Sequence, residues 1–229
     1  MAWILQLETS SKNCSVALSH QGQTEFLLEE AHEQYSHGQD LHPLIQKLMD
    51  QAPIELKNIE AIAVGKGPGS YTGLRIGVSA AKGMAYALDL PLIGINSLEL
   101  MAHGAEPTQQ GHYIPLVDAR RMEVYTSVFD QKLNEIRPTQ ALILEQENTF
   151  LDLNPDLPHY FFGDGTAKAK PLFTQENFYF LEAPLFPSAA HMSSLAFEAH
   201  QNKAWESVAY FEPYYLKEFM ITPPKKKTP

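Results

Sequence analysis

The chain has 229 residues, of which 44% are hydrophobic and 10% aromatic, enough for a sizeable core in one large domain or two small ones. Lys and Arg number 17 against 27 Asp and Glu, so the formal net charge is −10. A body this acidic is a poor lone binder of nucleic acid, because phosphate contacts need a basic face. The single cysteine, Cys14, excludes an intramolecular disulfide and a Cys-rich zinc site.

Targeting signals are not apparent in the sequence. The apolar start is broken by Gln6 and Glu8 and is too short for the hydrophobic part of a secretory signal. No run approaches the ~18 consecutive apolar residues of a membrane span. We therefore expect a cytoplasmic protein without membrane contact.

The first half of the chain predicts a mixed α/β unit. Three strand-like runs, at 3–7, 14–18 and 24–28, are expected to form an antiparallel meander. A helix is predicted over 41–49, where apolar residues recur at helical spacing, and Pro43 in its first turn indicates Asp40 as the N-cap; an earlier start near Ser36 would need a kink. The elements predicted next are a buried strand at 59–65, a helix at 72–88, a strand at 91–95 and a helix from Ser97 onward.

The second half repeats this order, which indicates an internal duplication with a boundary near 105–111. Strands are expected at 113–117, 123–129, 136–144, 160–162 and 178–181, and helices at 145–151, 165–172 and 188–200. The last residues, 222–229, are expected to form a flexible tail that contains Lys225 to Lys227.

The most distinctive segment, 65–77, reads GKGPGSYTGLRIG between a strand and a helix. It lacks the Gly-Lys-Ser/Thr end of a P-loop and the spacing of the dinucleotide fingerprint. Two interpretations stay open. Gly67, Gly69 and Ser70 can present backbone N–H groups to an anion at a helix N-terminus, or the glycines can serve a tight loop that needs positive φ angles.

Polar turns follow the first strand of each half, and each is either a phosphate contact or an ordinary turn. The first carries an acid and two hydroxyls, the second an acid and an arginine, and a later turn carries two glycines. Together with the glycine loop they give a candidate residual phosphate or nucleotide site: Glu8, Thr9, Ser10, Gly67, Gly69, Ser70, Asp118, Arg120, Gly163 and Gly165.

The helix at 72–88 is apolar nearly all round, so it is expected to be buried on two sides. Its small residues would let a second helix approach closely. That helix belongs either to a partner chain or to the 41–49 segment of the same chain. In the first case, Ala81→Glu is expected to abolish the complex and leave the fold intact.

Nine histidines raise the question of a metal site. His32, His37 and His42 are spaced by five residues, so they do not share a helix face. No His-Glu-x-x-His pattern and no nucleophile elbow is present. We therefore expect no metal site, whereas a triad formed by residues distant in sequence stays open at this point.

Three motifs resemble the bacterial TsaB (YeaZ) family: LETS at 7–10, GPGSYTGLRIG at 67–77 and DARRMEVY at 118–125. The resemblance runs along the whole chain and implies an α/β fold with two tandem ribonuclease-H-like lobes of the actin-like ATPase (ASKHA) type, mixed sheets and flanking helices. It implies an N-terminal lobe at 1–106 with the partner-binding helices. The C-terminal lobe would span 107–221, with its last helix or segment packing back on the first lobe.

Family membership implies a role in forming N6-threonylcarbamoyladenosine at position 37 of tRNAs that read ANN codons. The chain would be a non-catalytic subunit that binds and activates TsaD, the paralogue that transfers the threonylcarbamoyl group from threonylcarbamoyl-adenylate to adenine N6. The ATPase TsaE would join the complex, tRNA would bind only through the complex, and the chain alone would form a homodimer. The chain would require no cofactor, and ATP or ADP would bind either at the complex interface or in a residual cleft of this chain.

The family's contact with TsaD is a helix bundle, which places the interface here on the helices at 41–49 and 72–88. The residues implied are Leu41, Leu44, Ile45, Leu48, Gly73, Arg75, Ile76, Gly77, Ala80, Ala81 and Met84.

Two enzymatic alternatives remain. One is an actin-like ATPase or small-molecule kinase that uses Thr9, Ser10 and Asp118; Glu8, where the family usually has Asp, weakens it. The other is a metalloprotease-like activity, suggested by the family's older glycoprotease label. The absence of the His-x-x-x-His pair that TsaD carries argues against it.

Overall fold

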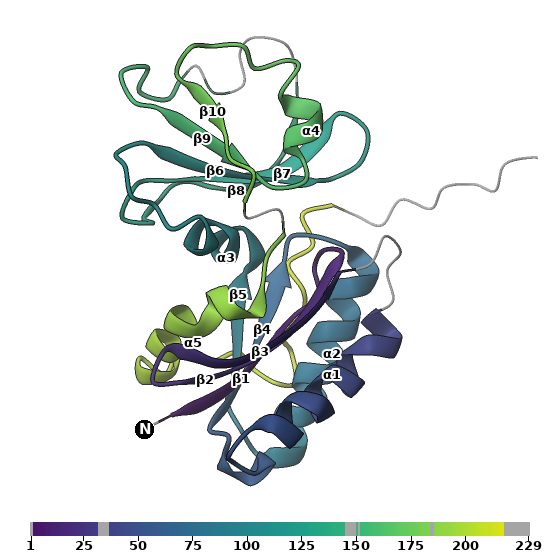
Figure 1. The fold of residues 1–229 in the computed structure, drawn as a ribbon. Coiled ribbons are helices and arrows are strands. Elements are labelled where there is room, and N and C mark those ends of the chain that lie inside the picture. The colour runs from purple at the N-terminus through teal and green to yellow at the C-terminus, as the bar shows by residue number, and fades with distance from the viewer. Residues whose placement is uncertain (1, 32–36, 145–149, 151, 184–185, 218–229) are drawn as a thin grey trace, which may run out of the picture.

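A computed structural model describes residues 2–31, 37–144, 150, 152–183 and 186–217. Two five-stranded sheets form two lobes, one above the other in Figure 1. The first sheet has the order β3-β2-β1-β4-β5, with β1 at Trp3–Glu8, β2 at Asn13–His20, β3 at Gln23–Ala31, β4 at Ala61–Gly67 and β5 at Leu92–Asn96. The second has the order β10-β9-β6-β7-β8, with β6 at His112–Asp118, β7 at Glu123–Phe129, β8 at Glu135–Ile143, β9 at His159–Phe162 and β10 at Phe178–Phe180.

The two sheets share one topology. In each, the first three strands are antiparallel, and the fourth and fifth are parallel to the first. β1 lies between β2 and β4, and β6 lies in the same way between β7 and β9. The predicted α/β fold with a duplicated order of elements is therefore confirmed.

Both faces of the first sheet are covered, which is why its central strands are almost continuously apolar. In β4, Ile62 and Val64 pack toward one layer of helices, whereas Ala61 and Ala63 pack toward the other. The first layer consists of α1 (His37–Gln51) and α2 (Tyr71–Leu88), which lie side by side in Figure 1. The second consists of the 3₁₀ turn η2 (Ala189–Met192) and α5 (Ser193–Gln201).

The second lobe joins the first through α3 (Ser97–Gly104). Leu98 and Met101 of this helix pack against Tyr113, Val117 and Phe162 of the second sheet. The opposite face of that sheet, which carries Phe161 of β9, packs on α4 (Thr166–Ala169) and on the aromatic side chains of Phe150 and Phe173. A short 3₁₀ turn, η1 (Leu56–Asn58), precedes β4.

The start of α1 corrects the prediction. The helix begins at His37, so Asp40 lies inside the first turn and is not the N-cap, and Pro43 lies within the helix. Pro43 cannot donate to the carbonyl of Gln39, but both residues are exposed, so water can satisfy that carbonyl. His37 fixes the earlier start, because its buried Nε2 lies 2.6 Å from the carbonyl oxygen of Ser11.

Other boundaries shift for local reasons. The strand expected at 59–65 runs over Ala61–Gly67. The helix expected at 165–172 is only α4, because Pro171 has no N–H to continue the helical hydrogen bonds, although Lys170 keeps helical backbone angles. The helix expected at 188–200 is divided into η2 and α5. Most of the helix expected at 145–151, and the tail at 222–229, lie outside the described residues.

Residues 204–217, which we call the C-terminal strap, run back along the first lobe without regular secondary structure (Figure 1). The backbone N–H of Glu206 donates to Leu92 of β5 at 2.8 Å, and that of Tyr214 donates to Lys66 of β4 at 2.7 Å. Phe211 is buried against Gly94. Across the described residues, no helix combines the length and the apolar character that crossing a membrane requires.

Candidate functional site

The glycine loop packs directly on the turn between β1 and β2. The N–H of Ser70 donates to the carbonyl oxygen of Ser10 at 2.6 Å, and Oγ1 of Thr9 donates to the carbonyl oxygen of Gly73 at 2.8 Å. Thr9 and Ser10 are almost completely buried. The amide at the start of α2 that an anion would use is therefore already bonded to the chain's own first hairpin.

The glycines of this loop are required by that close approach. A Cβ at Gly69 would overlap the carbonyl oxygen of Ser10, and a Cβ at Gly73 would overlap that of Thr9. Gly67 has a φ of +98°, which favours glycine. These contacts favour the tight-loop interpretation over the anion cradle.

Glu8 points inward from the end of β1. Its Oε1 accepts a hydrogen bond from the N–H of Ser10 at 2.5 Å, and its Oε2 accepts one from Oγ of Ser97 at 3.0 Å. Only a glycine at position 65 leaves room for the carboxyl group. Burial raises the pKa of Glu8, and the bonds from Ser10 and Ser97 oppose that rise. The carboxylate braces the loop and is not presented to a ligand.

This buried carboxyl predicts a pH dependence of stability. Because the pKa of Glu8 is above its ordinary value of 4.5, the folded chain binds the proton on Glu8 more tightly than the unfolded chain does. Its contribution is complete below about pH 4.5 and is lost as the pH rises through the folded-state pKa. Glu8→Gln removes this loss, so its melting temperature minus that of the wild type should increase from pH 4.5 to pH 8. A difference that does not change with pH would contradict the assignment.

The second-lobe half of the predicted site centres on Asp118, which is also engaged. Nζ of Lys168 lies 2.8 Å from Oδ1 of Asp118 and also donates to the carbonyl oxygens of Arg121 and Glu123 at 2.9 and 2.7 Å. The N–H of Arg120 donates to the same Oδ1 at 2.6 Å. A lysine of the chain itself therefore occupies the position that a cation would take beside Asp118.

The predicted glycines Gly163 and Gly165 lie next to Asp118. Gly163 has a φ of +102°, the N–H of Gly165 donates to the carbonyl of Leu116 at 2.9 Å, and Asp164 accepts from the N–H of Asp118 at 2.9 Å. Burial raises the pKa of Asp164, while the charges of Lys12 and Lys168 oppose this. Lys12 follows β1 and Asp164 follows β9, so the charge of the first polar turn acts on the second from the other lobe.

Sequence reasoning missed three partners in these contacts. Ser97, Asp164 and Lys168 complete the bonding of Glu8 and Asp118, but each lies at least 46 positions away along the chain. Only Asp164 carried a signal, because glycines flank it on both sides. The structure does bring Glu8, Thr9 and Ser10 together with Gly67, Gly69 and Ser70, yet as a closed contact.

Two hollows of about 360 and 340 Å³ lie near the lobe junction. The first is lined by Lys66, Asn96, Glu99, Glu135, Thr139 and Tyr214, among others, and the second by Lys66 and strap residues. None of the ten residues of the predicted phosphate site lines either hollow. Among the described residues, no group of three or more His, Cys, Asp or Glu is placed to hold a metal ion.

The predicted partner interface requires a correction. Seven of its residues are buried inside the chain's own first lobe: Leu41, Leu44, Ile45, Leu48, Gly73, Gly77 and Ala81. They hold α1 and α2 on the sheet and cannot line a contact with another chain. Ala81 is 0% exposed, so Ala81→Glu would disrupt the fold, and the predicted intact variant is wrong.

The other four residues, Arg75, Ile76, Ala80 and Met84 of α2, lie toward solvent, and we call them the helix-pair surface. Arg75 is exposed, and the three apolar residues are half-buried at the edge of the core. A Cβ atom added to Gly38 of α1 would lie 3.8 Å from Cδ1 of Ile76, so α1 borders this surface. A partner that docked on these helices would therefore meet fewer of the predicted residues.

Comparison with known proteins identifies the family of the chain. The sequence model of the family TsaD, tRNA N6-adenosine threonylcarbamoyltransferase, matches residues 29–210. A TsaB, "tRNA threonylcarbamoyladenosine biosynthesis protein", of Haemophilus influenzae is 34% identical over 224 residues, 93% of either chain. The TsaB of Escherichia coli is 31% identical and covers 93% of this chain and 94% of its own.

Solved structures agree. YeaZ from Pseudomonas aeruginosa superposes with a TM-score of 0.82 at 29% identity, over 94% of this chain and all of its own. The ethanolamine utilization protein EutJ, at 12% identity and a TM-score of 0.50, shares the fold alone. By sequence identity along nearly its full length and by fold, the chain belongs to the TsaB (YeaZ) family of tRNA threonylcarbamoyladenosine biosynthesis proteins.

Proposed function

We propose that the chain is a non-catalytic subunit that binds and activates TsaD in the threonylcarbamoylation of adenine 37 in tRNAs that read ANN codons. The observation that carries this proposal is the bond from Ser70 N–H to the Ser10 carbonyl, through which the first hairpin fills the glycine loop. A chain whose own hairpin takes up the Ser70 amide, which an anion would use, is better suited to a binding role than to ATP turnover.

Family relationship to TsaD and the apolar part of the helix-pair surface both support TsaD as the partner. The match to the TsaD model makes this chain and TsaD structural relatives, and related chains can pair through equivalent surfaces about a pseudo-twofold axis. Ile76, Ala80 and Met84 offer apolar area on an exposed helix, and the small Ala80 lets a second helix approach. In the absence of TsaD, the same surface would support a homodimer.

The net charge of the chain and the closed loop around Ser70 bear on how tRNA and nucleotide would bind. With a net charge of −10, the chain would meet tRNA only through its partner. The loop around Ser70 does not fit a phosphate as it stands, because Ser10 occupies it, so ATP or ADP would lie at the complex interface and not in this loop. TsaE would join the assembled pair in the cytoplasm.

Light scattering after size-exclusion chromatography tests the proposal. The chain alone should give a self-associated form, and mixing it with TsaD from the same organism should replace that form by a heterodimer. The isolated chain should release no phosphate from ATP above the buffer blank. A chain that stays monomeric and does not bind TsaD would contradict the proposal. ATP turnover abolished by Asp118→Asn would favour the kinase alternative instead.

A further inference from the structure

The C-terminal strap carries a concentration of exposed aromatic side chains. Tyr210 is 85% exposed, and Tyr214 and Tyr215 are each about 40% exposed. Tyr86, one helical turn beyond Lys82 on α2, is 82% exposed. Single exposed rings are ordinary, but several on one surface indicate a binding site, where tyrosine is over-represented among the residues that dominate affinity.

Two of these rings, Tyr210 and Tyr214, line a hollow of about 340 Å³ that no part of the proposed function uses. It is lined by Lys66, Glu206, Tyr210, Phe211, Glu212, Pro213 and Tyr214. The ammonium group of Lys66 lies 3.7 Å from the carboxylate of Glu206. Glu212 is exposed and makes no salt bridge with another described residue. The lining therefore combines tyrosine rings with a carboxylate that has no cation of its own among these residues.

The hollow is held in place before any ligand arrives. Nζ of Lys82 donates to the carbonyl oxygens of Ala209 and Phe211, at 3.3 and 2.8 Å, and Phe211 is buried in the core of the first lobe. Tyr214 is bonded through its backbone to Lys66. A preformed site loses less conformational entropy on binding.

The strap is continuous with the helix-pair surface. The ring of Tyr215 lies 5.0 Å from that of Tyr71 at the start of α2, and the guanidinium carbon of Arg75 lies 5.5 Å from the Tyr71 ring centroid. Arg75 is itself part of the helix-pair surface. A protein that docks on α2 therefore comes within reach of the strap.

We propose that the strap is a second docking site, which takes an arginine side chain of the protein that binds the helix-pair surface. A guanidinium group stacks on tyrosine rings and pairs with a carboxylate, so it suits both Tyr210 and Glu212. A nucleic acid would bring phosphates, which Glu212 repels. A second copy of this chain can pair through the helix-pair surface, but its net charge of −10 makes it a poorer source of an arginine for Glu212 than a basic protein surface, which is the occupant.

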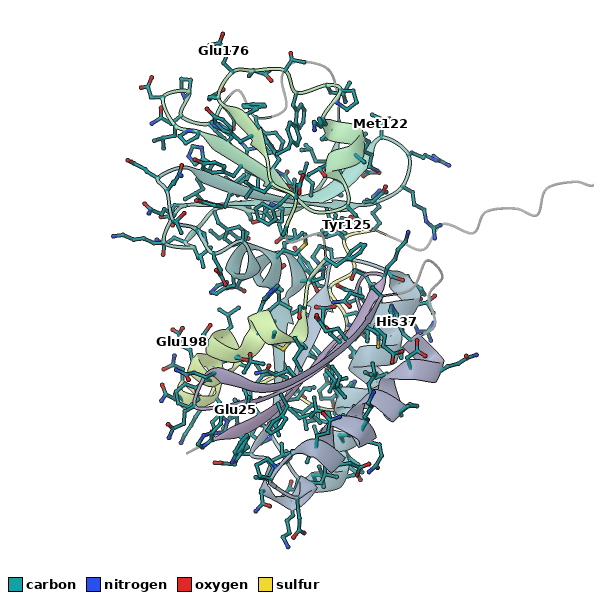
Figure 2. The ribbon with its side chains drawn as sticks, viewed as in Figure 1. Glu25, His37, Met122, Tyr125, Glu176 and Glu198 are labelled. Carbon is teal, nitrogen blue, oxygen red and sulfur yellow. The ribbon has the colours of Figure 1, made fainter. Side chains whose placement is uncertain are left out.

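This inference rests on the proposed binding of TsaD, and matched variants of the full chain test it. Tyr210→Ala and Glu212→Lys alter the hollow. Tyr179→Ala and Glu176→Lys make the same changes at exposed positions of the second lobe, where Glu176 lies at the far end of the molecule (Figure 2). The dissociation constant for TsaD is measured by titration calorimetry for all four variants, after their melting temperatures have been compared with that of the wild type.

The two strap variants should each weaken binding about tenfold or more, and the two controls should stay within about twofold of the wild type. The effect of Glu212→Lys should shrink at high salt, and that of Tyr210→Ala should not. Strap variants that bind as the wild type does would overturn the second site alone. A wild-type chain that does not bind TsaD would overturn the proposed function and this inference together.

Discussion

Replacing Gly73 by alanine should destabilise the chain by about 1–3 kcal/mol or more, because the new methyl group has no room. Its Cβ would overlap the carbonyl oxygen of Thr9 and lie 3.2 Å from the ring of His37. Relief requires the first hairpin to move away from α2, which breaks the bond from Thr9 Oγ1 to the Gly73 carbonyl. Urea unfolding followed by circular dichroism measures the change.

Gly83→Ala is the matched control on the same helix. Nothing lies within 4 Å of a Cβ at Gly83, so alanine there should stabilise the chain by about 0.5–1 kcal/mol through its higher helix propensity. The two substitutions therefore have opposite expected signs. If Gly73→Ala were as well tolerated as Gly83→Ala, the closed contact between the glycine loop and the first hairpin would be wrong.

Met84→Glu should weaken the complex with TsaD by about a hundredfold or more, because it places a charge in the apolar part of the helix-pair surface. Met84 is only half-buried, so its side chain can turn to water in the free chain and the fold should persist. Co-elution with TsaD and a melting curve of each variant are the measurements.

Met122→Glu is the control, because Met122 is an exposed methionine of the second lobe, away from α2 (Figure 2). Arg75→Glu gives an independent change at an exposed position of α2, with Arg121→Glu in the second lobe as its control. Complex formation should fail for both α2 variants and persist for both controls. If all four variants co-elute with TsaD, TsaD does not dock on the helix-pair surface.

The sequence was sufficient for the elements whose burial is local. The apolar run of β4 and the helical spacing in α1 and α2 predict their own type, because a buried strand and an amphipathic helix each carry a periodic pattern. The strap carries no periodic pattern of this kind. One buried ring at Phe211 and backbone bonds to Leu92 and Lys66 hold it, and neither leaves a repeat in the sequence.

The candidate site was harder to predict because its contacts are distant in sequence. The glycines of the loop indicated a close approach but not what approaches, and Ser10, 60 positions before Ser70, fills that place. The apolar character of α2 indicated two buried sides. It did not reveal that the small residues Gly73 and Gly77 accommodate Thr9 and not another chain. In both cases, the residue type predicts a contact and the fold decides the partner.

The rate of threonylcarbamoyladenosine formation tests the central claim most directly. TsaD is incubated with unmodified tRNA and threonylcarbamoyl-adenylate, with TsaE present throughout, either alone, with the wild-type chain or with Met84→Glu. The account predicts rapid formation only with the wild-type chain, and a rate with Met84→Glu close to that of TsaD alone. Equal rates with and without the chain, or full activity with a Met84→Glu chain that no longer co-elutes with TsaD, would contradict it.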